Sequence, residues 1–193
     1  MPLKLKGTFL LMLTCSVAAA RLLQKASPSG EPGRDEDARS VYSWVISHLT
    51  RRDKLYLIAP ETRRASYPDG SCLEIPWAHA TDLREIRADF DHNNDVTRTL
   101  PASFPTQKPY VILDSEIANE LLKSGRLSDS PIIRQRFAGA GHLLLFSDVS
   151  FNRKRNLALV YVGGGLCAEA WWTVLGKDNG VWNRRWSGCG AVS

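Results

Sequence analysis

Few residues of this 193-residue chain belong to the patterns that mark a metal site or a covalent catalyst. Its four histidines form no HExxH motif and its four cysteines form no CxxC motif, so the sequence offers no zinc site of a recognisable kind. No serine stands in a G-x-S-x-G sequence, which excludes the nucleophile elbow of the α/β-hydrolases. The motifs therefore assign no catalytic residue, no metal ligand and no cofactor.

The chain also lacks any apolar run that approaches the ~20 residues a membrane-spanning helix requires. Its first apolar run, Phe9 to Leu13, follows Lys4 and Lys6 and precedes three alanines at 18–20. A positive flank, a short apolar core and small residues in this order are typical of a secretory signal peptide. We expect residues 1–20 to be cleaved, and the mature protein to be secreted or periplasmic with no stable membrane anchor.

An alternative to cleavage after Ala20 is acylation of Cys15, which would make the protein a lipoprotein. A lipidated cysteine usually follows a small residue such as Gly, Ala or Ser, and Thr14 fits that position poorly. Release after cleavage is therefore the favoured interpretation.

Three cysteines remain after such a cleavage, Cys72, Cys167 and Cys189. An odd number in an oxidising compartment leaves one thiol over. The sequence Asp-Asn-Gly at 178–180 predicts a hairpin turn, which would bring the two later cysteines opposite each other. We expect a disulfide between Cys167 and Cys189, and an unpaired Cys72.

The positive charge of the chain is mild, because the formal net charge of +5 falls to about +3 without the signal peptide. Residues 153–155 and the pair Arg184 and Arg185 do interleave with tryptophans, as in single-strand nucleic-acid binders. Regular strand alternation would place Trp182, Arg184 and Trp186 on one side and Arg185 on the other. Too few charges share a surface, and we expect no nucleic-acid partner.

The composition divides the remaining chain into a linker and one domain. Residues 21–34 end in a stretch rich in Pro, Gly and Ser, which cannot bury enough apolar surface to order itself. Residues 35–193 have the length of one globular domain. The linker is thus expected to lead into a single domain that begins with a helix.

The apolar periodicity of the domain predicts helices first and strands later. Helical spacing is found near residues 41–49, 81–93, 115–124 and 131–137, with short strands at 55–59 and 110–113. Further strands are expected at 142–146, 157–162, 170–175 and 181–186, with a turn at Gly163 to Gly165. The pattern predicts an α+β fold, with the helices packed on one face of a C-terminal antiparallel β-meander.

The segment at residues 147–152 reads Ser-Asp-Val-Ser-Phe-Asn and leads into an Ala-Leu-Val-Tyr-Val strand at 158–162. Cys167 and a closing hairpin with Gly180 and Trp182 follow. This series resembles a recurring class of exported bacterial proteins, whose loop has the form Ser-x-Val-[Gly/Ser]-Phe-Asn.

The resemblance extends upstream to Asp89, Phe90 and Asn93, and so runs from about residue 81 to 189. The class usually has Gly where this chain has Ser150. The resemblance implies the fold of the C-terminal half and export from a bacterial cell, and it implies no activity.

Two constellations invite a chemical interpretation. Oxygen ligands recur between Asp89 and Asp95 as in the first half of a calcium loop, but the twelfth position is Leu100 instead of an acidic residue. His142, Ser147 and Asp148 contain the residue types of a hydrolase triad. Because these three residues lie on one extended segment, we expect a structural loop and keep an exported hydrolase as the alternative.

We expect the loop at 147–152 to pin the sheet, with Phe151 as a buried anchor. Asn152 would bond backbone groups of the turn, while Ser147 and Asp148 would stay near the surface. In the absence of a catalytic motif, the expected function is non-enzymatic binding. The expected partner is a protein or another component of the cell envelope, whose identity the sequence does not give.

Overall fold

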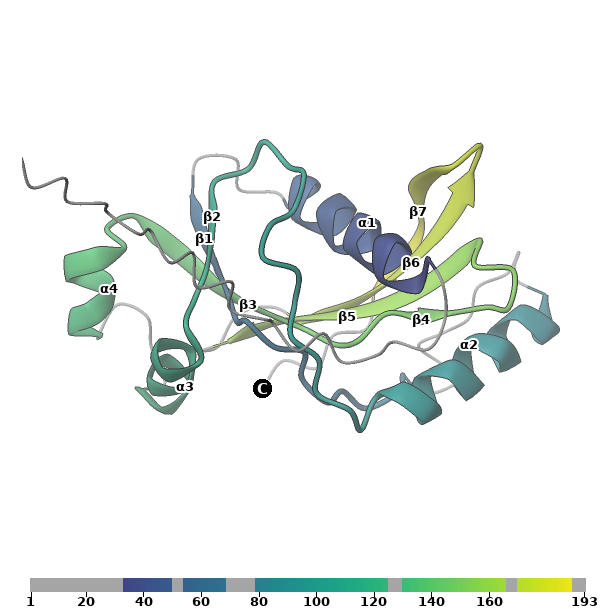
Figure 1. Cartoon of the computed structure of the whole chain (residues 1–193), viewed down its shortest axis with the longest axis horizontal. Helices are drawn as coiled ribbons and strands as arrows, with labels where there is room; N and C mark the ends of the chain where they lie inside the picture. The colour runs from purple at the N-terminus through teal and green to yellow at the C-terminus, as the bar shows by residue number, and fades with distance from the viewer. Residues whose placement is uncertain (1–32, 50–53, 69–78, 125–129, 166–169, 189–193) are drawn as a thin grey trace, which may run out of the picture.

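The computed structural model describes residues 33–49, 54–68, 79–124, 130–165 and 170–188. In this part of the chain, four helices surround one seven-stranded sheet (Figure 1). The helices are α1 (Arg34–Ser47), α2 (Ala80–Asn93), α3 (Ser115–Ser124) and α4 (Pro131–Arg136). The strands are β1 (Leu55–Ile58), β2 (Tyr110–Ile112), β3 (Ala140–Phe146), β4 (Ser150–Phe151), β5 (Leu157–Gly165), β6 (Trp171–Asp178) and β7 (Val181–Gly188).

The sheet is mixed, and its strand order is β2-β1-β3-β5-β6-β7, with β4 paired to β5. The strands β5, β6 and β7 form the expected antiparallel meander, and the α+β class is confirmed. The pairing of β1 with β2 and with β3 is parallel. Local periodicity did not predict this parallel part, because its partners are far apart in the sequence.

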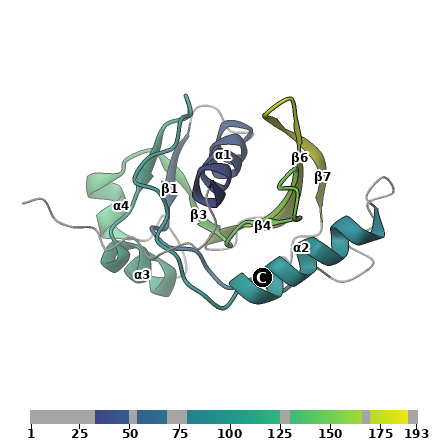
Figure 2. The same ribbon diagram turned by 45° about the vertical axis from the view of Figure 1, so that its right-hand side comes forward.

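The helices cover both faces of the sheet, whereas the sequence placed them on one face (Figure 2). On β5, Val160 packs in the core that contains α1, and its neighbour Leu159 packs in the core that contains α2. On β1 and β3, Leu57 and Leu143 face α3 and α4. The continuous apolar run of β5 is the sequence signal for this arrangement, because both sides of the strand are buried.

The glycines at 163–165 do not form the expected turn but continue β5. They pair with Leu143, Leu144 and Leu145 of β3. A Cβ atom on Gly163 would lie 3.1 Å from the ring of Tyr161, so glycine provides space for this ring. The chain can therefore remain extended at a point where three glycines suggested a bend.

The two tryptophans of β7 lie on opposite faces of the sheet, which corrects the expected alternation. Trp182 is buried on the α1 side and Trp186 packs on the α2 side. The register places Trp186 opposite Val174 but Arg184 opposite Leu175. Arg185 is thus the additional residue of a β-bulge, and such a bulge reverses the alternation beyond it.

The boundary between linker and domain also differs from the expected one, because Arg34 is the first residue of α1 and is buried. The expected signal peptide, Cys72, Cys167 and Cys189 lie outside the described residues, and so does the expected disulfide. Among the described helices, none is long and apolar enough to cross a membrane.

Candidate functional site

The loop that follows β3 is buried, and it forms the junction between α1, α2 and the sheet. Phe151 is 3% exposed, and its ring centroid lies 6.1 Å from that of Trp182. The expected burial of this ring is therefore confirmed. The expectation that Ser147 and Asp148 stay near the surface is wrong, since they are 1% and 8% exposed.

Asn152 holds the turn after β4 in the expected way. Its side-chain oxygen accepts hydrogen bonds from the backbone N–H groups of Asn156 and Leu157. Its backbone oxygen accepts another from Arg155, which has a positive φ of 50°. The asparagine thus provides partners for backbone groups that the turn leaves unpaired.

Arg34 is the centre of a buried polar network at this junction. Its guanidinium donates two parallel hydrogen bonds of 3.0 Å to the carboxylate of Asp89, and one of 2.8 Å to the carbonyl of Val149. It also lies 3.9 Å from Asp148 and 5.3 Å from the centroid of Phe151. This fork-to-carboxylate geometry is among the strong charged contacts in proteins, and here it joins α1 to α2.

Asp148 is the most deeply placed charge of the network. Burial raises its pKa, and the nearby Arg34 and Arg98 oppose that rise. Arg98 donates to Asp148 over 2.8 Å, and the N–H of Val149 donates to its other oxygen. Beside it, burial raises the pKa of Tyr42 well above its ordinary value, so this hydroxyl donates to the carbonyl of Ser147.

Three acidic side chains on one face of α2 hold the chain around β4. Asp89 accepts a hydrogen bond of 2.8 Å from the N–H of Phe151, and Glu85 accepts one of 3.0 Å from the N–H of Arg153. Asp82 accepts another from the side chain of Asn152. Alternate backbone N–H groups are thus satisfied by a helix instead of by a further strand, and α2 covers this edge of β4.

The structure does not bring the three candidate hydrolase residues together. His142 lies on β3 with its ring 5.9 Å from that of Tyr56, and Ser147 follows five positions later, about 16 Å away along an extended chain. The Ser147 hydroxyl donates to the carbonyl of Asp148 and accepts from the N–H of Tyr161. Ser147 and Asp148 therefore serve the loop, and His142 lies at the other end of the strand.

The segment from Asp89 to Asp95 is not a loop, because α2 continues through Asn93. Its three aspartates contact three different arginines: Asp89 contacts Arg34, Asp91 contacts Arg87, and Asp95 contacts Arg64. Nowhere in the described ranges do three His, Cys, Asp or Glu side chains gather as metal ligands. The regular oxygen spacing reflects the end of one helix and the turn that follows it, with several ion pairs.

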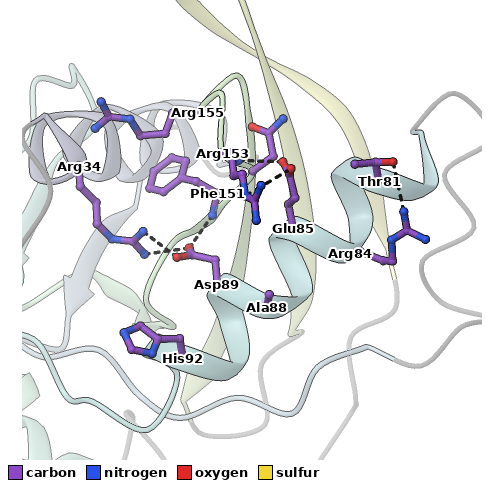
Figure 3. Close-up of a pocket in the computed structure, with 11 residues that line it drawn as sticks. Arg34, Thr81, Arg84, Glu85, Ala88, Asp89, His92, Phe151, Arg153 and Arg155 are labelled. Carbon is purple, nitrogen blue, oxygen red and sulfur yellow. Dashed lines mark hydrogen bonds and ion pairs between the residues drawn. The ribbon is translucent and has the colours of Figure 1, made fainter.

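An open groove of about 560 Å³ lies beside the junction, between α2, the start of α1 and the turn after β4 (Figure 3). Its charged lining is mostly arginine. The arginines are Arg34, Arg84, Arg153 and Arg155, and the carboxylates are Glu85 and Asp89. The remaining lining residues are Thr81, Ala88, His92, Phe151 and Asn152. The lining thus has two more cationic side chains than carboxylates.

The arginines of the groove differ in how the fold holds them. Arg34 is fixed on Asp89, and Arg155 lies 3.8 Å from Asp37, which Lys177 also contacts at 2.5 Å. The side chain of Arg153 is 88% exposed and reaches Glu85 only at 3.7 Å. Arg84 is exposed as well.

Within the described part of the chain, Arg84 contacts the hydroxyl of Thr81 at 3.3 Å and has no carboxylate partner (Figure 3). The two exposed arginines stand on opposite walls of the groove, since Arg84 belongs to α2 and Arg153 to the turn after β4.

Sequence reasoning did not find this site. Arg34 was assigned to the linker, and Arg84 and Arg98 belonged to no motif. The available signal was the acidic spacing on α2, with Asp82, Glu85 and Asp89 on one helical face. Comparison of the chain with protein-family models, curated proteins and solved structures finds no match.

Proposed function

We propose that this chain is an exported, non-enzymatic binding protein that takes an anionic ligand in the groove between α2 and the turn after β4. One observation carries the proposal: four arginines and two carboxylates line the groove, so its lining has a charge of +2. An excess of one sign in a concave surface attracts ligands of the opposite sign. Arginine is also the side chain best suited to carboxylate or phosphate recognition.

The hydrogen bonds of Asp89 support a binding role over a chemical one. Its two oxygens accept four hydrogen bonds, from the two terminal nitrogens of the Arg34 guanidinium, from Asn93 and from the N–H of Phe151. A carboxylate bonded in this way is held in one position, and its acceptor sites are occupied by groups of the protein. The acid in the floor of the groove therefore stabilises the site.

The location of the protein is part of the same proposal. Cleavage after Ala20 would release a mature chain that begins at Arg21, and its partner would be a protein or another component of the cell envelope. The likeness of residues 147–152 to the loop of exported bacterial proteins supports this placement. The intact mass of the exported protein tests it, and a mass that starts at an acylated Cys15 would replace release with lipid anchoring.

Retention of the mature protein on immobilised poly-L-glutamate tests the groove. We expect Arg84→Ala to elute at clearly lower salt than the wild type, because it removes an exposed cation from the site. Arg134→Ala is the matched control, since Arg134 is exposed on α4 and removes the same charge elsewhere. If the two variants elute at equally lowered salt, retention depends only on the net charge of the protein, and the groove is not the binding site.

A further inference from the structure

We propose that the ligand of the groove is an acidic stretch of a peptide, bound as an extended chain whose neighbouring acidic side chains reach Arg84 and Arg153 on opposite walls. This inference rests on the proposed function and specifies the class of its ligand.

Arg84 and Arg153 lie at the same level of the groove, because both adjoin Glu85. Arg84 precedes Glu85 on α2, while Arg153 approaches Glu85 from the opposing turn, with its N–H at 3.0 Å and its guanidinium at 3.7 Å (Figure 3). An anionic group entering the groove at this level therefore meets a cation on each wall. Arg34 remains occupied by Asp89 and serves the fold.

The geometry of an extended peptide suits this pair of walls. Successive side chains of an extended chain point to opposite sides. Two adjacent acidic residues can thus reach Arg84 on one wall and Arg153 on the other. Acidic residues two positions apart point to the same wall, so both can contact only one of the two arginines.

Glu85 favours a peptide over a sulfated or phosphorylated polymer. Its carboxylate stands between the two arginines and is 21% exposed. A densely charged polymer brings further anionic groups against this carboxylate, and like charges repel each other. A peptide backbone instead brings N–H donors, for which a carboxylate is a good acceptor. A peptide that alternates backbone N–H donors with side-chain carboxylates is therefore complementary both to Glu85 and to the two arginines.

Fluorescence anisotropy with labelled peptides of equal length and charge tests this inference on the full mature chain. One probe has two adjacent aspartates flanked by Gly and Ser, and the other has its two aspartates separated by one Gly. We expect the adjacent probe to bind about fivefold more tightly, the difference that one exposed ion pair of good geometry makes. Arg84→Ala and Arg153→Ala should each remove this difference, and Arg134→Ala should leave it.

Glu85→Gln provides a second readout, because glutamine keeps the acceptor oxygen for the Arg153 N–H and loses the charge. We expect this variant to bind polyphosphate more tightly than the wild type, and melting temperatures to show that all variants are folded. Equal affinity for the two peptides, or tighter binding of polyphosphate than of the adjacent probe by the wild type, would overturn the peptide inference while the anionic groove stands. If Arg84→Ala changes the binding of neither peptides nor polyphosphate, the proposed function fails as well.

Discussion

Asp148 illustrates how a single buried charge can serve a fold at a cost. Its carboxylate accepts hydrogen bonds from Arg98 and from the N–H of Val149, with Arg34 nearby. Even so, the loss of hydration raises its pKa, because burial outweighs the two arginines. Two donors at this position require an acceptor. An ionised carboxylate provides it, but burial removes the water that would otherwise stabilise its charge.

This imbalance predicts the pH dependence of stability at Asp148. A pKa that is raised on folding means that the folded state binds the proton more tightly than the unfolded state. The contribution of Asp148 is therefore complete below the pKa of an unfolded aspartate, about 3.9, and is lost as the pH rises through the higher pKa of the folded protein. Urea denaturation at several pH values measures this for the wild type and for Asp148→Asn.

We expect the stability of the wild type relative to Asp148→Asn to fall as the pH rises across this interval. The other carboxylates titrate in both proteins, so the difference isolates the one at position 148. A relative stability that increases with pH would mean that the ion pairs with Arg34 and Arg98 outweigh burial.

Phe151 carries a separate prediction about packing. Its ring is 3% exposed and contacts both Trp182 and the guanidinium of Arg34. Phe151→Ala should lower the free energy of unfolding by about 3 to 5 kcal/mol, because it leaves a cavity at the junction. The control is Val181→Ala, at a side chain that is 61% exposed, which should stay within about 0.5 kcal/mol. A neutral Phe151→Ala in urea denaturation would show that the ring does not anchor the loop.

At the scale of elements, the ion pair between Arg34 and Asp89 joins α1 to α2. The side chains of Arg34 and Asp89 are 10% and 21% exposed. Because water has little access to this ion pair, water does not easily replace a partner that is removed. Removing the arginine leaves a carboxylate that is still surrounded by protein. The two helices lie on different faces of the sheet, so this pair crosses the edge formed by β4 (Figure 2).

We therefore expect Arg34→Ala to destabilise the protein by about 3 kcal/mol. The matched control is Arg64→Ala, which removes the partner of Asp95 from a pair whose side chains are 77% and 67% exposed. That substitution should cost at most about 0.5 kcal/mol, because exposed ion pairs contribute little. Thermal or urea unfolding of both variants compares them, and equal effects would contradict the role given to Arg34.

Most individual elements could be predicted from the sequence, because their signals are local. The spacing of Val41 and Val45 indicates α1, and the apolar run at 157–162 indicates β5. The pairing of elements could not be predicted in this way. Tyr56 on β1 lies beside His142 on β3 in a parallel register. Parallel strands are not joined by a short turn, so no local sequence signal indicates that they pair.

The site was harder to predict than the fold for a related reason. Charged residues are usually exposed, and Asp148 was expected near the surface. Arg34 ends a stretch rich in Pro, Gly and Ser, and was expected in the linker. Each is buried because a residue far along the chain neutralises it. Local patterns contain no information about such partners, and the arginines of the groove follow no fixed spacing.

The whole molecule combines a local and a non-local half in one sheet. The strands β5, β6 and β7 follow each other through short connections, and the turn at Asn179 and Gly180 has the positive φ angles of a tight hairpin. The strands β1, β2 and β3 are joined by long segments that contain α2, α3 and α4. The groove lies where α1, which opens the domain, meets the loop that leads into the meander.

The position of Arg34 has a consequence for the order in which the chain is made. Synthesis delivers the N-terminus first, yet Arg34 bonds Asp89, 55 residues later, and the carbonyl of Val149, 115 residues later. Contacts of such large sequence separation form slowly, since a long loop must close before they stabilise anything. The first helix of the domain has to wait for one of the last segments to be synthesised, and until then its buried arginine remains in water.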